Sequence, residues 1–116
     1  MRLDAKEILD LVLARLDDMK AEDTLTIDLR NKSSIGDYMV ISSGRSQRHV
    51  GSVADRVVED LHKAGIAARV QGVPHCDWVL IDAGDVIVHV FRPEVRAFYN
   101  LEKMWAPARP HGRRAS

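Results

Sequence analysis

This sequence contains a single cysteine, no long apolar run and no excess of either charge. Cys76 therefore cannot form a disulfide within the chain. No apolar run approaches the roughly 20 residues that a membrane-spanning helix needs, so we expect no membrane partner. With 17 basic and 17 acidic residues the formal net charge is zero. The overall charge thus gives no argument for nucleic acid, a membrane surface or an acidic substrate.

The chain is also short, and its 116 residues suit one domain with a buried core. The first residues, Met1 to Lys6, lack an apolar signal segment, which predicts a cytoplasmic location. Residues 107–116 contain two prolines, three arginines and no apolar periodicity. We therefore predict one domain over residues 1–105 and a disordered basic tail over residues 106–116.

Hydrophobic periodicity predicts an α/β domain. Apolar residues recur at helical spacing over residues 4–19 and 50–65, which indicates two amphipathic helices. Other apolar patterns predict strands over 24–29, 37–43, 67–71, 77–81 and 85–91, and a last helix from Pro93 toward Trp105. The short link between the last two strands predicts an antiparallel hairpin. This order implies a mixed sheet of about five strands with packed helices, in which strand 37–43 is interior.

Most aromatic side chains lie near the C-terminal end of the predicted domain. Five of the six aromatics are Trp78, Phe91, Phe98, Tyr99 and Trp105. Clustered aromatics form either core or a docking surface. Trp78 shares a strand face with Leu80, so it is either a buried core residue or a binding anchor with a charged rim beside Asp77.

His89 presents a similar choice. It alternates with Ile87 and Phe91, on the strand face opposite three valines, Val86, Val88 and Val90. If the valine face forms the core, His89 looks outward; if a helix covers the other face, His89 is buried. The sequence leaves both alternatives open.

Acidic residues around the hairpin raise the question of a metal or paired-carboxylate site. His75 and Cys76 are adjacent, so in an extended segment they point to opposite sides. Asp77, Asp82 and Asp85 are spaced five and three residues apart, which does not give the same-face pair of two-metal phosphoryl transfer. We expect Asp82 and Asp85 to shape the turn by bonding nearby amides, with no metal and no cofactor.

The segment Gly44-Arg45-Ser46, before the second helix, resembles a phosphate-binding loop. It lacks the glycine-rich pattern and the Lys-Ser/Thr ending of a P-loop, so we expect Ser46 simply to cap the helix. No serine is paired with a histidine and an acid by any signature of a nucleophile, and a hydrolase is not indicated.

Three segments together resemble the ribosomal silencing factors, the Iojap family: KSSIGDYMV at 32–40, SGRSQRHV at 43–50, and DWVLIDAGDVIVHVFRPEVRAFYNLEKMW at 77–105. The resemblance spans roughly residues 5–105. It implies a nucleotidyltransferase-like fold that lacks catalytic residues, a protein that is not an enzyme, and a homodimer when free. It also implies docking on protein fourteen of the large ribosomal subunit. Such docking would block the small subunit and lower translation under nutrient limitation.

The resemblance further implies a partner-binding surface. Carried over by position, it comprises Trp78, Asp82, Gly84, Asp85, His89, Arg92, Tyr99, Glu102 and Trp105. An interface of about 800 Å² per partner would suffice for stable docking. The tail residues Arg109, Arg113 and Arg114 could add a minor contact with ribosomal RNA.

Two other functions stay open at this point. One is a nucleotidyltransferase-like, nucleotide-binding enzyme that uses residues 43–46 and the aspartates of the hairpin. The other is a homodimeric interaction module with a different protein target.

Overall fold

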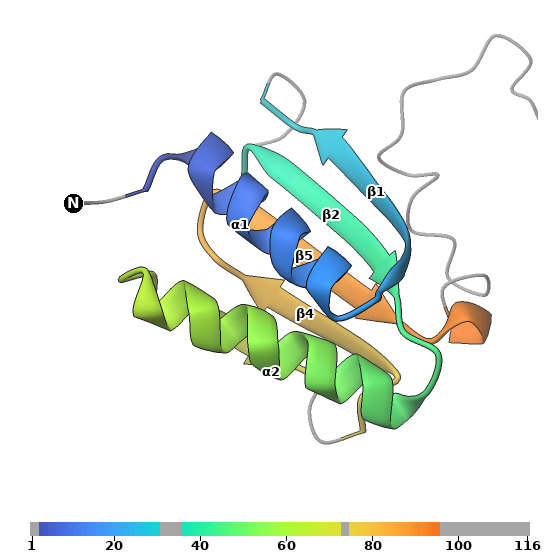
Figure 1. Ribbon diagram of the computed structural model, residues 1–116. Helices are drawn as coiled ribbons and strands as arrows, with labels where there is room; N and C mark the ends of the chain where they lie inside the picture. Colours follow the sequence, from blue (N-terminus) through green and yellow to red (C-terminus); the bar gives the residue numbers. More distant parts are fainter. Residues whose placement is uncertain (1–2, 31–35, 73–74, 96–116) are drawn as a thin grey trace, which may run out of the picture.

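The computed structural model describes residues 3–30, 36–72 and 75–95. In chain order, its helices and strands are α1 (Ala5–Asp18), β1 (Glu22–Asp28), β2 (Tyr38–Ser43), α2 (Gln47–Lys63), β3 (Arg69–Gln71), β4 (Trp78–Asp82) and β5 (Val86–Phe91). The strands form one five-stranded sheet in the order β1-β2-β5-β4-β3 (Figure 1). β2 and β5 pair in parallel and the other pairs are antiparallel, so the predicted mixed sheet and the predicted hairpin are confirmed.

The predicted C-terminal elements are described only in part. Residues 93–95 are helical, in agreement with a helix that begins at Pro93. The remainder of that helix and the predicted tail over residues 106–116 lie outside the described residues.

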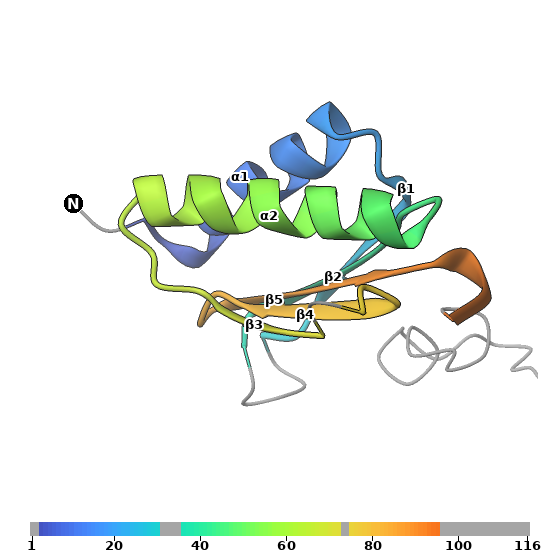
Figure 2. The ribbon, with the colours of Figure 1, turned by 90° about the horizontal axis from the view of Figure 1, so that it is seen from below.

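Both described helices lie on the same face of the sheet (Figure 2). Their apolar stripes pack on β4 and β5 and form the main core. Its most buried members include Val12, Leu16, Val53, Val57, Leu61, Val79, Ile81, Val86, Val88 and Val90. The valine face of β5 is therefore the face that the helices cover.

The opposite face of the sheet carries a second, smaller apolar cluster. Its buried members are Ile27, Leu29, Met39, Ile41 and Phe91. Trp78 and Val95 are partly buried against them. Because β2 contributes to both clusters, all six of its residues are buried, and the predicted interior position of this strand is confirmed.

Side chains cap the start of each helix. Asp4 accepts a hydrogen bond of 2.8 Å from the Glu7 amide, and Glu7 accepts one of 2.9 Å from the Asp4 amide, which completes a capping box. Ser46 accepts a hydrogen bond of 3.1 Å from the amide of His49 at the start of α2. The predicted capping role of Ser46 is thus confirmed.

His49 joins the end of α1 to the start of α2. Its Nδ1 accepts a hydrogen bond of 2.9 Å from the Arg45 amide, and its Nε2 lies 2.8 Å from the carbonyl oxygen of Met19. Since Nδ1 is an acceptor, Nε2 carries the proton and donates to Met19. The imidazole of His49 therefore ties together two segments that are remote in sequence.

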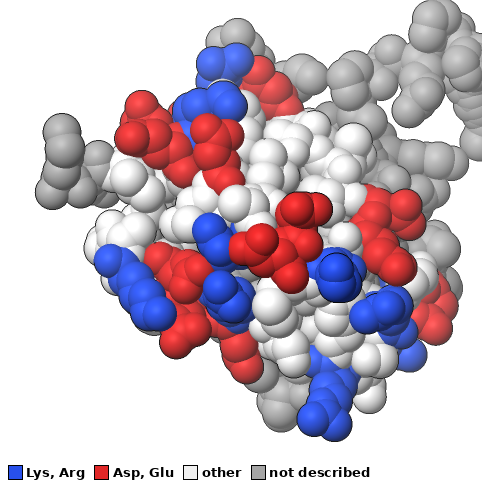
Figure 3. Space-filling view, in the orientation of Figure 1, with Lys and Arg blue, Asp and Glu red and all other residues white. Residues whose placement is uncertain are grey.

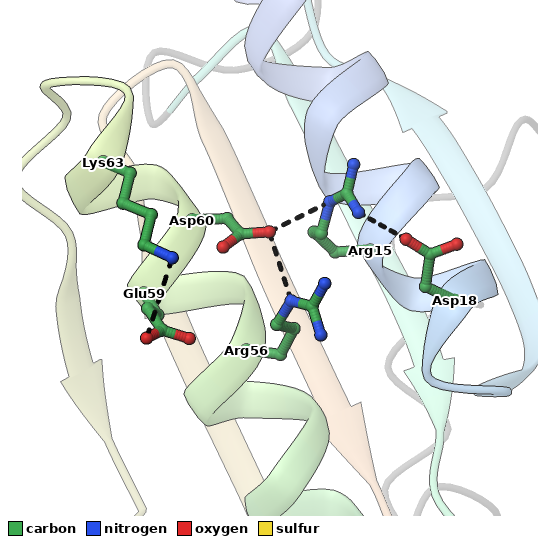
Figure 4. A network of polar contacts seen from close by, with 6 residues as sticks. All are labelled: Arg15, Asp18, Arg56, Glu59, Asp60 and Lys63. Carbon is green, nitrogen blue, oxygen red and sulfur yellow. Dashed lines mark hydrogen bonds and ion pairs between the residues drawn. The ribbon is translucent and has the colours of Figure 1, made fainter.

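Charges of both signs alternate over the helix-bearing side of the molecule (Figure 3). Asp60 of α2 lies between two arginines there (Figure 4). Its Oδ2 is 3.1 Å from Arg15 Nε of α1 and 3.2 Å from Arg56 Nε. Arg15 Nε is buried and makes no hydrogen bond within the described residues, so its approach to Asp60 is a contact between charges. Asp60 thus links α1 to α2.

We expect Asp60→Asn to lower the free energy of unfolding by about 1–2 kcal/mol, because it removes the carboxylate that both arginines share in a half-buried place. Glu59→Gln is the matched control on the same helix. The Glu59 side chain is 61% exposed, against 17% for Asp60, and its Oε2 lies 3.9 Å from Lys63 Nζ. We expect the control to change stability by less than about 0.5 kcal/mol. Urea denaturation measures both values, and equal losses would contradict the role of Asp60.

Finally, in the described ranges neither helix is both long and apolar enough to cross a membrane.

Candidate functional site

An aromatic group lies at one end of the β4–β5 hairpin, on the sheet face opposite the helices. The register pairs Trp78 with Phe91 across the two strands. Their ring centroids are 4.8 Å apart and the rings are stacked at 27°. Phe91 is fully buried, whereas Trp78 is partly exposed. Trp78 therefore combines a fixed apolar base with a surface that a partner can reach, as the anchor alternative requires.

His89 lies beside this pair and is almost completely buried. Trp78 Nε1 donates a hydrogen bond of 2.9 Å to His89 Nδ1. Burial lowers the pKa of His89 from 6.5 to about 4, so its imidazole is neutral near pH 7. His89 is only 7% exposed, which corrects the outward alternative. His89 is thus buried, as the second alternative predicts. α1 and α2 lie on the other face of the sheet, whereas Val95, in the helical segment 93–95, packs against the cluster that contains Phe91.

Asp77 and Arg92 form a charged pair next to Trp78. Arg92 Nε donates to Asp77 Oδ1 at 2.8 Å, and the Arg92 amide donates to the Asp77 carbonyl oxygen at 3.0 Å. Gln47 of α2 also donates to Asp77 Oδ1, at 2.9 Å. The hydrogen bond from Gln47, together with the charge of Arg92, holds the pKa of Asp77 below its usual range. These contacts hold a charged pair at the aromatic end of the hairpin, next to the start of α2.

The turn at the other end of the hairpin is held by its own residues. Asp82 accepts a hydrogen bond of 2.9 Å from the Gly84 amide, and Gly84 has a positive φ of 85°. The carbonyl oxygen of Asp85 accepts hydrogen bonds from the amides of Asp37 and Tyr38, at 2.7 and 3.1 Å. The prediction that Asp82 shapes this turn is confirmed.

The nine residues of the predicted partner-binding surface thus fall into separate groups. Trp78, His89 and Arg92 lie toward the aromatic end of the hairpin, whereas Asp82, Gly84 and Asp85 lie at its turn. Because β4 is five residues long, its two ends are about 13 Å apart. One protein partner can span that distance. The other three predicted residues, Tyr99, Glu102 and Trp105, lie outside the described residues.

A depression of about 370 Å³ opens beside Trp78. It is lined by Gln71, Gly72, Trp78 and Leu80. Gly72 has a φ of 98°, and a Cβ built on it would lie 2.1 Å from the carbonyl oxygen of Trp78. Only glycine therefore fits where β3 passes the start of β4.

Gly72→Ala is expected to lower the free energy of unfolding by about 2 kcal/mol, through an unfavourable φ and a backbone collision. Gly84→Ala is a matched control, because Gly84 also has a positive φ but nothing lies within 4 Å of its built Cβ. We expect Gly84→Ala to lower the free energy of unfolding by about 1 kcal/mol, which is the cost of the positive φ without a collision. Thermal melting of both variants tests the comparison. Equal losses would mean that the backbone near Trp78 can move without cost.

The alternative chemical sites gain no support from the geometry. Asp77 and Asp82 lie at opposite ends of β4. His75 is exposed while Cys76 is buried, as expected for adjacent side chains that diverge. Among the described residues no group of three histidine, cysteine, aspartate or glutamate side chains could hold a metal ion. Ser46, in the segment 43–46 that the nucleotide-binding alternative would use, caps α2 through its hydroxyl.

Sequence reasoning missed two sets of contacts in this region. The bond between Gln47 and Asp77 and the bond between Trp78 and His89 both join different elements. Only the strand register could have suggested the second, because a diagonal pair on one face needs the alignment of Trp78 with Phe91.

A single mixed sheet with the two helices α1 and α2 on one face defines the described part of the chain as a small α/β domain. Comparison with known proteins identifies its family. Residues 2–115 match the family described as "Ribosomal silencing factor during starvation". The chain belongs to this family of ribosomal silencing factors, which confirms the resemblance inferred from the sequence.

Individual relatives agree with this assignment. The chain is 52% identical over 103 residues to ribosomal silencing factor RsfS of Zymomonas mobilis, covering 88% of this chain and 77% of that protein. It is 30% identical over 105 residues to the mouse protein named "Mitochondrial assembly of ribosomal large subunit protein 1", covering 87% of this chain and 46% of that one. A crystal structure of a Chromobacterium violaceum protein superposes with a TM-score of 0.88 at 35% identity, covering 93% and 91% of the two chains.

Proposed function

We propose that this protein docks on protein fourteen of the large ribosomal subunit and sterically blocks association with the small subunit, so that translation falls under nutrient limitation. The family assignment supports a ribosome-associated silencing role, and its description includes starvation. The name of the mouse relative refers to the large subunit, which is consistent with this side of the ribosome.

The observation that carries the proposal is the partly exposed Trp78 on a rigid base. Its ring stacks on buried Phe91. The ion pair of Asp77 and Arg92 lies at the same end of the hairpin, where Gln47 of α2 also bonds Asp77. Protein interfaces concentrate aromatic anchors at their centres and polar residues at their rims. The helix-bearing side instead shows interspersed charges without a basic patch (Figure 3). The sheet face opposite the helices is therefore the face we assign to docking.

Several further properties belong to the same proposal. The protein acts by occupying a surface and catalyses no reaction. When free it is a homodimer, located in the cytoplasm, and its fold is related to that of nucleotidyltransferases. Contact of the basic tail with ribosomal RNA is a minor part of docking.

Gradient sedimentation tests the proposal directly. Purified protein is mixed with isolated large subunits, and small subunits are then added. We expect the protein to sediment with large subunits and the fraction of joined ribosomes to fall as its concentration rises. Recovery of the protein only at the top of the gradient would overturn the proposal. Binding without reduced joining would overturn its steric mechanism.

A further inference from the structure

We propose that His89 is a positioning residue, which fixes the Trp78 ring for docking without itself contacting the ribosome. This inference rests on the proposed function and assigns a distinct part within it. His89 is only 7% exposed, so it can offer a partner almost no contact area. Any effect of His89 on docking must therefore pass through the residue it holds.

The geometry gives His89 a specific hold on Trp78. The hydrogen bond from Trp78 Nε1 to His89 Nδ1 is 2.9 Å long. The two ring centroids are 5.9 Å apart, and His89 also stacks with Phe91 at a centroid distance of 5.9 Å. Three rings therefore restrain one another, and the hydrogen bond fixes the rotation of the indole about its own side-chain bonds.

Two costs of docking fall because of this arrangement. A ring that is already fixed loses little conformational freedom when a partner covers it. The indole N–H, which can only donate, would be cut off from water at an interface, and leaving it without an acceptor would be unfavourable. His89 Nδ1 supplies that acceptor before the partner arrives. The partner consequently meets the apolar surface of the indole.

Two variants of the same size separate this role from packing. His89→Leu removes the acceptor, whereas His89→Asn places an amide oxygen near the position of Nδ1. His62→Leu is the control for loss of a histidine, because His62 is exposed on α2. Thermal melting establishes that each variant is folded. Binding to isolated large subunits is then measured by sedimentation at graded protein concentrations.

A spectroscopic signal reports the hydrogen bond independently of the ribosome. The chain has two tryptophans, so a ¹H–¹⁵N spectrum contains two indole N–H signals, and Trp78→Phe identifies the one from Trp78. We expect this signal to exchange slowly with solvent in the parent protein. Exchange should be faster in His89→Leu and slow again in His89→Asn.

We expect His89→Leu to bind large subunits about three- to tenfold more weakly than His89→Asn, the range that one hydrogen bond represents. His62→Leu should bind like the parent protein. Equal binding by the Leu and Asn variants, with the parent protein bound, would overturn the positioning role while leaving the proposed function intact. If the parent protein itself fails to bind, the proposed function is wrong. The solvent exchange of the Trp78 indole N–H then tests whether His89 holds the Trp78 ring. An exchange rate in His89→Leu equal to that of the parent protein would overturn this hold.

Discussion

Trp78→Ala is expected to weaken binding to the large ribosomal subunit by about thirtyfold or more while the domain stays folded. Central aromatic anchors commonly account for 2 kcal/mol or more of binding free energy. Trp78 is partly exposed, so its removal should cost the fold less than the 3–5 kcal/mol typical of a fully buried aromatic. Sedimentation with large subunits measures the binding, and circular dichroism with thermal melting measures the fold.

Two controls make the Trp78 result interpretable. Trp78→Phe keeps an aromatic surface on Phe91 but loses the indole N–H, so it should retain most of the binding. Leu25→Ala removes an exposed apolar side chain from edge strand β1, at the far side of the sheet from β4, and should bind normally. A folded Trp78→Ala variant with parental affinity would show that Trp78 is no anchor. A variant that unfolds at 25 °C would show that its role is mainly in the core.

Acidification from pH 6.5 to pH 4 is expected to lower the free energy of unfolding by up to about 3 kcal/mol through His89 alone. Burial lowers the pKa of His89 to about 4, against 6.5 in the unfolded chain. Between these values the unfolded state binds a proton that the folded state excludes, so stability falls as pH falls. Each pH unit between the two pKa values corresponds to about 1.4 kcal/mol of unfolding free energy. Once protonated, His89 Nδ1 could no longer accept the hydrogen bond from Trp78 Nε1.

The contribution of His89 can be isolated by difference. Urea denaturation at several pH values between 7 and 4 is compared for the parent protein and His89→Asn, with His62→Asn as a control at an exposed position. The difference in unfolding free energy between the parent protein and His89→Asn should change between pH 7 and pH 4. The unfolding free energy of the His62→Asn control should follow that of the parent protein. Asp77, whose pKa is also lowered, adds its effect only as pH falls below its ordinary value of 3.8. If the unfolding free energies of the parent protein and His89→Asn change with pH in parallel, the lowered pKa of His89 is contradicted.

The fold was largely predictable because each element has a strong local pattern. α2 buries Val50, Val53, Val57 and Leu61 at regular spacing, and Ser46 marks its start. β5 alternates valines with other residues, and the short link to β4 dictates an antiparallel pair. Local periodicity and turn length thus determine both the elements and one of the strand pairings.

The site was predicted less completely, because it depends on which strands are neighbours. Alternation placed Ile87, His89 and Phe91 on one face but could not say that this face is buried near Phe91. The contacts of Asp77 depend on Gln47, which arrives from a helix thirty residues earlier in the chain. Long-range partners of this kind leave no mark in the local sequence. The family resemblance supplied the residues of the proposed surface but not its internal hydrogen bonds.

The parallel pairing of β2 with β5 has a consequence for the order of folding. β1 with β2, and β4 with β5, are neighbours along the chain, whereas β2 and β5 are separated by α2, β3 and β4. Closing the longer loop costs more chain entropy, so the parallel seam should form after the two local pairs. Trp78, His89 and Phe91 all lie on the β4–β5 pair. The aromatic site would then take its strand alignment early, before the two halves of the sheet have joined.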